Sequence, residues 1–141
     1  MTIYTIGFTR KSARTFFTLL KDAGVRRLLD IRLNNLSQLA GYTKRDDLAF
    51  FCESMGLEYR HLTELAPTQP MLDASRQGGG WAQYEREFLA LMRSRRIEEL
   101  PRDLFAGACL LCSEPTPEHC HRRVVADYLA SRWPAVSIHH L

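Results

Sequence analysis

The chain lacks a long hydrophobic run. Nowhere in its 141 residues is there a stretch approaching the roughly 20 consecutive apolar residues that a membrane span requires. Residues 1–6 also lack the basic segment followed by an apolar one that marks a secretory signal. We therefore expect a cytoplasmic protein with no membrane partner.

Cysteine is scarce, and its spacing is irregular. Cys52, Cys109, Cys112 and Cys120 are too few and too unevenly spaced for a disulfide framework, which favours free thiols in a reducing compartment. Cys109 and Cys112 have the spacing of a redox motif. Side chains three apart on a strand point to opposite faces, however, so these two thiols are not expected to meet.

Lysine is scarcer still. Of the 19 basic residues only three are lysines, so arginine supplies almost all of the positive charge. Arginine carries a planar fork of donors that suits carboxylate and phosphate groups, although a coding bias would give the same composition. A cluster of Arg93, Arg95, Arg96 and Arg102 is the sole support for a nucleic-acid partner, because no RNA- or DNA-binding motif accompanies it.

Phosphate-binding fingerprints are also missing. The sequence contains neither Gly-x-x-x-x-Gly-Lys nor Gly-x-Gly-x-x-Gly, which excludes the common mononucleotide and dinucleotide turns. No cysteine is followed six positions later by arginine, which excludes the phosphate-cradling loop of cysteine phosphatases. The sequence indicates no cofactor.

What the chain does contain is an alternation of short apolar segments with amphipathic ones. Strands are predicted over residues 3–6, 28–31, 57–62, 108–112 and 136–140, and helices over 12–23, 43–55, 81–92 and from Thr116–Pro117 onward. This alternation predicts a single α/β domain of three layers, with a mostly parallel, Rossmann-like sheet and helices on both faces. The most apolar segment, 108–112, is expected to be a central strand.

Residues 66–80 interrupt the alternation. They contain Pro67, Pro70 and three consecutive glycines, and they are predicted to form a long irregular connection. Long connections in compact domains are often functional, and a pocket closed by this one would favour an enzyme.

Polar residues gather just past the predicted strands, where parallel sheets bind ligands. Gly7 and Thr9 follow the first strand, Asp30 and Arg32 follow the second, and the run 112–123 follows the fourth. We expect side chains from these segments to converge. The binding candidates are Gly7, Thr9, Arg32 and Arg122, and the catalytic candidates are Asp30, Cys112, Glu114, Cys120 and His121.

Each candidate near the fourth helix has two interpretations. Cys120, predicted in the first helical turn, is either a thiol nucleophile favoured by the helix dipole or a small buried residue. His121 either handles protons or only hydrogen-bonds Asp30 or Glu114. Arg122 either holds an anion at the helix start or pairs with a carboxylate.

The same residues include candidate metal ligands. Cys112, Cys120 and His121 carry zinc donors, with Glu114 or Asp30 as a fourth. Adjacent residues on a helix diverge by about 100°, which opposes shared ligation by Cys120 and His121. The sequence therefore predicts no bound metal.

Several segments together carry a family resemblance. Tyr4-Thr5-Ile6-Gly7, Leu29-Asp30-Ile31-Arg32, and Leu110-Leu111-Cys112-Ser113-Glu114 followed by Cys120-His121-Arg122 resemble the domain-of-unknown-function family numbered 488. The resemblance covers nearly the whole chain and implies a single α/β domain. It points to the same site residues without assigning roles to them.

The leading hypothesis is an enzyme acting on a small anionic molecule, phosphate-bearing or nucleotide-like. Arg32 and Arg122 would hold the anion, and His121 with Glu114 or Asp30 would transfer protons close to a thiol. The alternatives are a ligand-binding or redox-sensing module with the same pocket, and a nucleic-acid-associated protein.

Overall fold

A sheet of five parallel strands forms the middle layer of the part of the chain that the computed structural model describes, residues 1–36 and 41–141. The spatial order is β3-β2-β4-β1-β5, with every neighbouring pair parallel. This confirms the predicted parallel sheet, with the segment 108–112 at its centre. The strands are β1 (Thr2–Gly7), β2 (Arg27–Asp30), β3 (Glu58–His61), β4 (Ala108–Cys112) and β5 (Ser137–His140).

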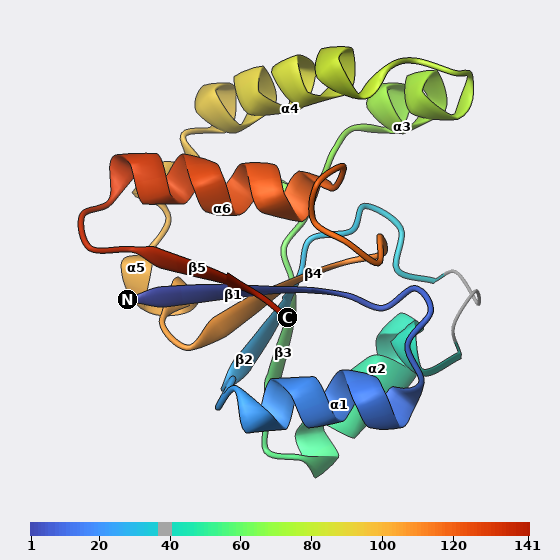
Figure 1. Ribbon diagram of the computed structural model, residues 1–141, viewed down its shortest axis with the longest axis vertical. Helices are drawn as coiled ribbons and strands as arrows, with labels where there is room; N and C mark the ends of the chain where they lie inside the picture. The colour runs from blue at the N-terminus through green and yellow to red at the C-terminus, as the bar shows by residue number, and fades with distance from the viewer. Residues whose placement is uncertain (37–40) are drawn as a thin grey trace.

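Helices cover both faces of this sheet, as predicted (Figure 1). One face carries α1 (Ala13–Asp22) and α2 (Arg45–Ser54), and the other carries α4 (Trp81–Arg95) and α6 (His121–Arg132). Short helical pieces complete the described chain: η1 (Gly41–Thr43), η2 (Thr63–Leu65), α3 (Gln69–Arg76), η3 (Ile97–Glu99) and α5 (Arg102–Phe105). Among these described helices, none has the length and apolar character to cross a bilayer.

The central strand β4 separates two hydrophobic clusters. Leu110 and Cys112 belong to the cluster under α4 and α6, whereas Cys109 and Leu111 belong to the cluster under α1 and α2. Successive strand residues point to opposite faces, and here both faces are covered by helices. An unbroken apolar run is therefore stable at this position. Cys109 and Cys112 lie on opposite faces, as expected.

The predicted irregular connection over residues 66–80 is wrong in its middle, where the chain forms α3. The Thr68 hydroxyl accepts a hydrogen bond from the Met71 amide at 3.3 Å and so caps the helix. Pro70 lies in the first turn, where its missing N–H costs nothing. The chain then turns at Gly78, whose φ of 91° favours glycine. The prolines and glycines thus mark the two ends of a short helix.

The central position of β4 generates a stability prediction. Leu110 is fully buried, so Leu110→Ala should lower the free energy of unfolding by about 2–5 kcal/mol through lost burial and a cavity. Met55, which is 55% exposed just after α2, provides the control. Met55→Ala should change the free energy of unfolding by less than about 0.5 kcal/mol. Urea denaturation followed by circular dichroism measures both, and equal losses would contradict the described core.

Candidate functional site

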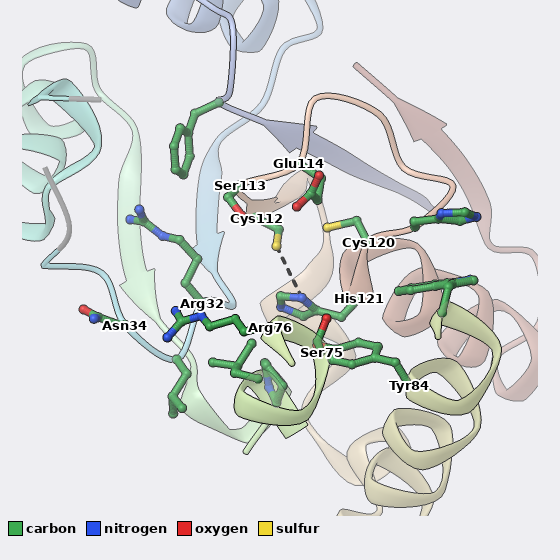
Figure 2. A pocket seen from close by; sticks show the side chains of 16 residues that line it. Arg32, Asn34, Ser75, Arg76, Tyr84, Cys112, Ser113, Glu114, Cys120 and His121 are labelled. Atoms are coloured by element: carbon green, nitrogen blue, oxygen red, sulfur yellow. Dashed lines mark hydrogen bonds between the residues drawn. The ribbon is translucent and has the colours of Figure 1, made fainter. Parts of the chain in front are cut away.

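A pocket of about 340 Å³ lies at the carboxyl ends of β2 and β4 (Figure 2). Its walls come from segments far apart in sequence: the residues after β1, β2 and β4, the turn before α6, the helix α3 and the start of α4. This volume suits a small molecule. Helix α3 belongs to the 66–80 connection, so this connection contributes to the wall of the pocket.

The pocket brings together five of the predicted site residues. Arg32, Cys112, Glu114, Cys120 and His121 line it. The other four predicted residues, Gly7, Thr9, Asp30 and Arg122, lie outside its lining.

Asp30 lies behind Arg32 and orients it. The buried Asp30 carboxylate accepts hydrogen bonds from Nε and Nη2 of Arg32, each at 2.8 Å, and from the Tyr59 hydroxyl at 2.6 Å. Burial by itself lowers the pKa of Arg32, but the hydrogen bond and charge of Asp30 raise that pKa above its ordinary value. Within the described residues Nη1 of Arg32 has no hydrogen-bond partner, so this atom is left to meet a ligand.

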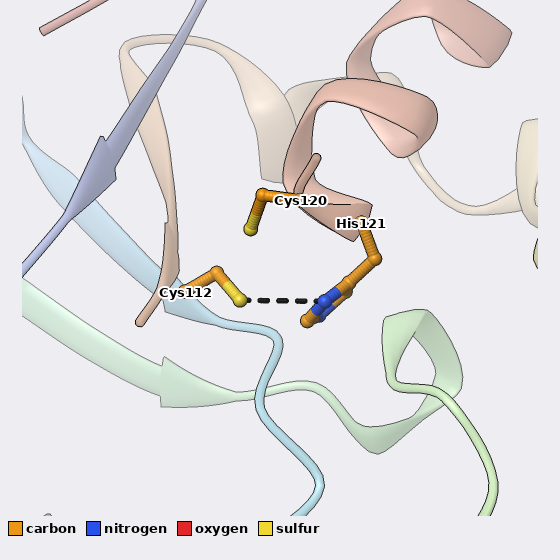
Figure 3. A group of neighbouring side chains, drawn as sticks. All are labelled: Cys112, Cys120 and His121. Carbon is orange, nitrogen blue, oxygen red and sulfur yellow. Dashed lines mark hydrogen bonds between the residues drawn. The ribbon is translucent and has the colours of Figure 1, made fainter. Parts of the chain in front are cut away.

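His121 is fixed between two strands. Its Nε2 lies 2.8 Å from the Ile31 carbonyl oxygen, and since a carbonyl only accepts, Nε2 carries the proton. The lone pair of Nδ1 is then directed at Cys112 Sγ, 3.3 Å away (Figure 3). The ring also packs edge-on against Phe88, with centroids 5.2 Å apart. His121 therefore presents an acceptor nitrogen to the thiols.

Cys120 precedes α6, and the predicted helix start at Thr116–Pro117 is wrong. The helix begins at His121, and Cys120 is its N-cap residue in an extended conformation, with φ −135° and ψ 139°. The Cys120 amide closes a separate turn onto the Pro117 carbonyl at 3.2 Å. The 100° divergence expected between Cys120 and His121 holds only inside a helix, so that argument fails. The sulfurs of Cys112 and Cys120 and a ring nitrogen of His121 all lie within 4.8 Å of one another.

The two thiols differ in acidity. Burial raises the pKa of Cys112, but hydrogen bonding with Cys120 and with the Ser113 backbone, together with the charge of Arg122, lowers that pKa below its ordinary value. Burial raises the pKa of Cys120, and its hydrogen bond and charge interaction with Cys112 raise it further. Cys112 is therefore the more acidic sulfur.

Gly7, Thr9 and Arg122 hold the loop after β4. The guanidinium of the fully buried Arg122 donates from Nη1 to the Glu114 carbonyl at 2.8 Å, and the Thr9 amide donates to the Ser113 carbonyl at 3.0 Å. A Cβ on Gly7 would lie 1.6 Å from the Glu114 carbonyl oxygen. These three residues set the position of a pocket wall and do not line the pocket themselves.

The arginines proposed as a nucleic-acid surface have structural partners. Nη1 of Arg95 donates to the Ala66 carbonyl at 2.7 Å, and Arg96 pairs with Glu99 at 3.6 Å. Arg102 donates to the Pro134 carbonyl at 3.2 Å and lies over the Trp133 ring. These contacts account for much of the cluster.

Sequence reasoning missed the far wall of the pocket. Arg76, in the last turn of α3, adds a second cation to the lining. Trp81 stacks on Tyr84 and on His119, with centroids 5.4 Å and 5.2 Å apart, and all three rings line the pocket. The sole signal in the sequence was the length of the 66–80 connection, because nothing local ties Arg76 to Arg32.

Six of the residues that line this pocket belong to the segments that carry the family resemblance: Arg32, Cys112, Ser113, Glu114, Cys120 and His121. The chain matches the sequence profile of "Domain of unknown function DUF488" over residues 12–129. The chain belongs to this family. None of the curated proteins and none of the solved structures matches the DUF488 chain significantly. The family brings no substrate with it, so the function is argued from the site.

The close approach at Gly7 generates a prediction. Gly7→Ala would drive a methyl group into the Glu114 carbonyl, so it should lower the free energy of unfolding by about 1–3 kcal/mol or more and displace the loop. At Gly41 a Cβ meets no atom of the described residues within 4 Å, so Gly41→Ala should change the free energy of unfolding by less than about 0.5 kcal/mol. Differential scanning fluorimetry compares the two variants. An unchanged Tm for Gly7→Ala would show that the loop is not held as described.

Proposed function

We propose that this DUF488 protein is an enzyme that acts on a small anionic molecule, phosphate-bearing or nucleotide-like, in the pocket at the carboxyl edge of its sheet. The observation that carries the proposal is the shared lining (Figure 2): Arg32 and Arg76 line the same pocket as the Cys112, Cys120 and His121 side chains. Cations that hold a ligand beside groups that react are the arrangement that a catalytic site needs.

The two arginines supply the affinity for an anion. Asp30 balances the charge of Arg32, but its carboxylate faces Nε and Nη2 and leaves Nη1 as a hydrogen-bond donor without a partner within the described residues. Arg76 is exposed at the end of its helix. Glu114, also in the lining, reduces the positive charge of the pocket, so the site should select an anion by geometry rather than attract every anion.

The reactive groups line the same pocket. The Nδ1 lone pair of His121 accepts a proton from a substrate or from the Cys112 thiol, which lies 3.3 Å away. Glu114 offers a carboxylate for the same purpose at the pocket mouth. The Ile31 carbonyl holds the histidine in the required tautomer, so the acceptor is ready before substrate binds.

The aromatic rings support the nucleotide-like class. His119 is exposed, and it lies at the end of a stack with Trp81 and Tyr84 beside the pocket. A planar base placed against His119 would extend that stack, and base–aromatic stacking stabilises such complexes by about 1–3 kcal/mol per base.

Inorganic phosphate and adenosine monophosphate provide the binding test. Each should raise the Tm, by the equivalent of about 1.4 kcal/mol at ten times its dissociation constant. Arg76→Ala should abolish the rise. Arg86→Ala removes the same charge from an exposed helical position outside the lining and should preserve it. Equal losses in both variants, or no rise in the parent protein, would overturn the proposed anion site.

Turnover needs a separate measurement. A panel of nucleotides and sugar phosphates is incubated with the protein, and products are detected by mass spectrometry. His121→Gln should abolish product formation while the phosphate-induced rise in Tm remains, because the imidazole handles protons and the arginines hold the anion. A retained rise with no product from any compound would favour the ligand-binding alternative.

A further inference from the structure

Three soft or borderline donors face one another at the pocket wall. The sulfurs of Cys112 and Cys120 and a ring nitrogen of His121 lie within 4.8 Å of one another, and the Cys112 sulfur is 3.3 Å from Nδ1 (Figure 3). In a tetrahedral zinc site with ordinary bond lengths, such donors are separated by roughly 3.5–3.8 Å. Small side-chain adjustments would therefore place all three on one ion.

The orientation of His121 is the one that a metal ligand requires. Zinc-binding histidines almost always donate their other ring N–H to a carboxylate, a carbonyl or water, which fixes the ring and the tautomer. Here Nε2 donates to the Ile31 carbonyl at 2.8 Å, and Nδ1 faces the sulfurs. The supporting hydrogen bond is thus already made without any ion.

The charge and the burial of these side chains also favour a metal ion. Cys112 and Cys120 are only 4% and 2% exposed. Two thiolates and a neutral imidazole balance a divalent cation, so no net charge is buried. Thiolate and imidazole donors select zinc over magnesium or calcium. We propose that Cys112, Cys120 and His121 bind one zinc ion whose fourth coordination position opens onto the pocket.

The fourth position is left to a non-protein ligand. Among the described residues, no further histidine, cysteine or carboxylate belongs to this group of donors. The Asp30 carboxylate is occupied by Arg32 and Tyr59. Three protein ligands with an open fourth position are typical of catalytic rather than structural zinc, and the ligand here would be water or an oxygen of the bound anion. A bound zinc would occupy Nδ1 of His121 and the Cys112 sulfur, so in the zinc-loaded protein Glu114 would accept the proton that the proposed function gives to His121. This part rests on the proposed function, whereas the binding of zinc does not.

Elemental analysis of the full chain, purified with a reductant that does not chelate metals, tests this site. The parent protein should carry about one zinc per chain, and Cys112→Ser should carry at least about tenfold less. Cys109→Ala is the matched control, because Cys109 is a buried cysteine of the same strand on the opposite face, and it should retain the metal. A parent protein without zinc, or equal zinc in both variants, counts against the site.

A second measurement does not depend on the folding of a variant. Zinc is removed from the parent protein with a chelator, and cobalt(II) is added to the reduced apoprotein. Bound cobalt should show the intense visible bands of tetrahedral geometry and a thiolate charge-transfer band in the near ultraviolet, and zinc should displace both. A reduced apoprotein that takes up neither zinc nor cobalt overturns the proposal.

The phosphate-induced rise in Tm, measured on the same samples, separates this inference from the proposed function. A rise with no zinc uptake would overturn the metal site and leave the anion pocket standing. Zinc uptake with no rise would support the metal site and overturn the anion-binding function.

Discussion

The candidate site depends on one hydrogen bond, from Nε2 of His121 to the Ile31 carbonyl. It ties the first residue of α6 to the chain that leaves β2, and the same ring reaches Cys112 at the end of β4. The imidazole therefore joins helix α6, the chain just after β2 and the end of β4 at one point. It also decides the tautomer, because only a protonated Nε2 can face a carbonyl. Without it neither the tautomer nor the direction of the Nδ1 lone pair would be set.

A second constraint holds the loop that follows β4. The loop after β4 passes so close to β1 that only glycine fits at Gly7, and Arg122 fixes the loop carbonyl from inside the core. Arg122 is fully buried, and its Nη2 has no hydrogen-bond partner within the described residues. Its charge still acts on the site, since it contributes to the lowered pKa of Cys112. A buried cation outside the pocket thus favours anionic sulfur inside it.

Arg32 shows how a carboxylate partner can orient a guanidinium and still leave one of its donors unpaired within the described residues. The carboxylate of Asp30 takes one edge of the guanidinium and removes its freedom to rotate, and the Phe8 ring packs against it with its centroid 5.2 Å from Cζ. The remaining donor is then presented in a fixed direction, so binding an anion costs little side-chain entropy. Pairing with a carboxylate and holding an anion were the two interpretations of Arg122; it is Arg32 that pairs with a carboxylate, and one of its donors stays without a partner within the described residues.

Much of the fold can be predicted from the sequence, because the alternation of apolar with amphipathic segments is a local property. It determined the parallel sheet, the central place of residues 108–112 and the edge at which a pocket forms. It could not determine which polar residues meet there, since Arg32, Arg76 and Cys112 come together only through the order β3-β2-β4-β1-β5. Nor could it place Cys120, whose extended backbone depends on a turn ending one residue before α6. Because Cys120 lies one residue outside α6, its sulfur is directed toward Cys112. That contact exists only once β4 and α6 are packed together.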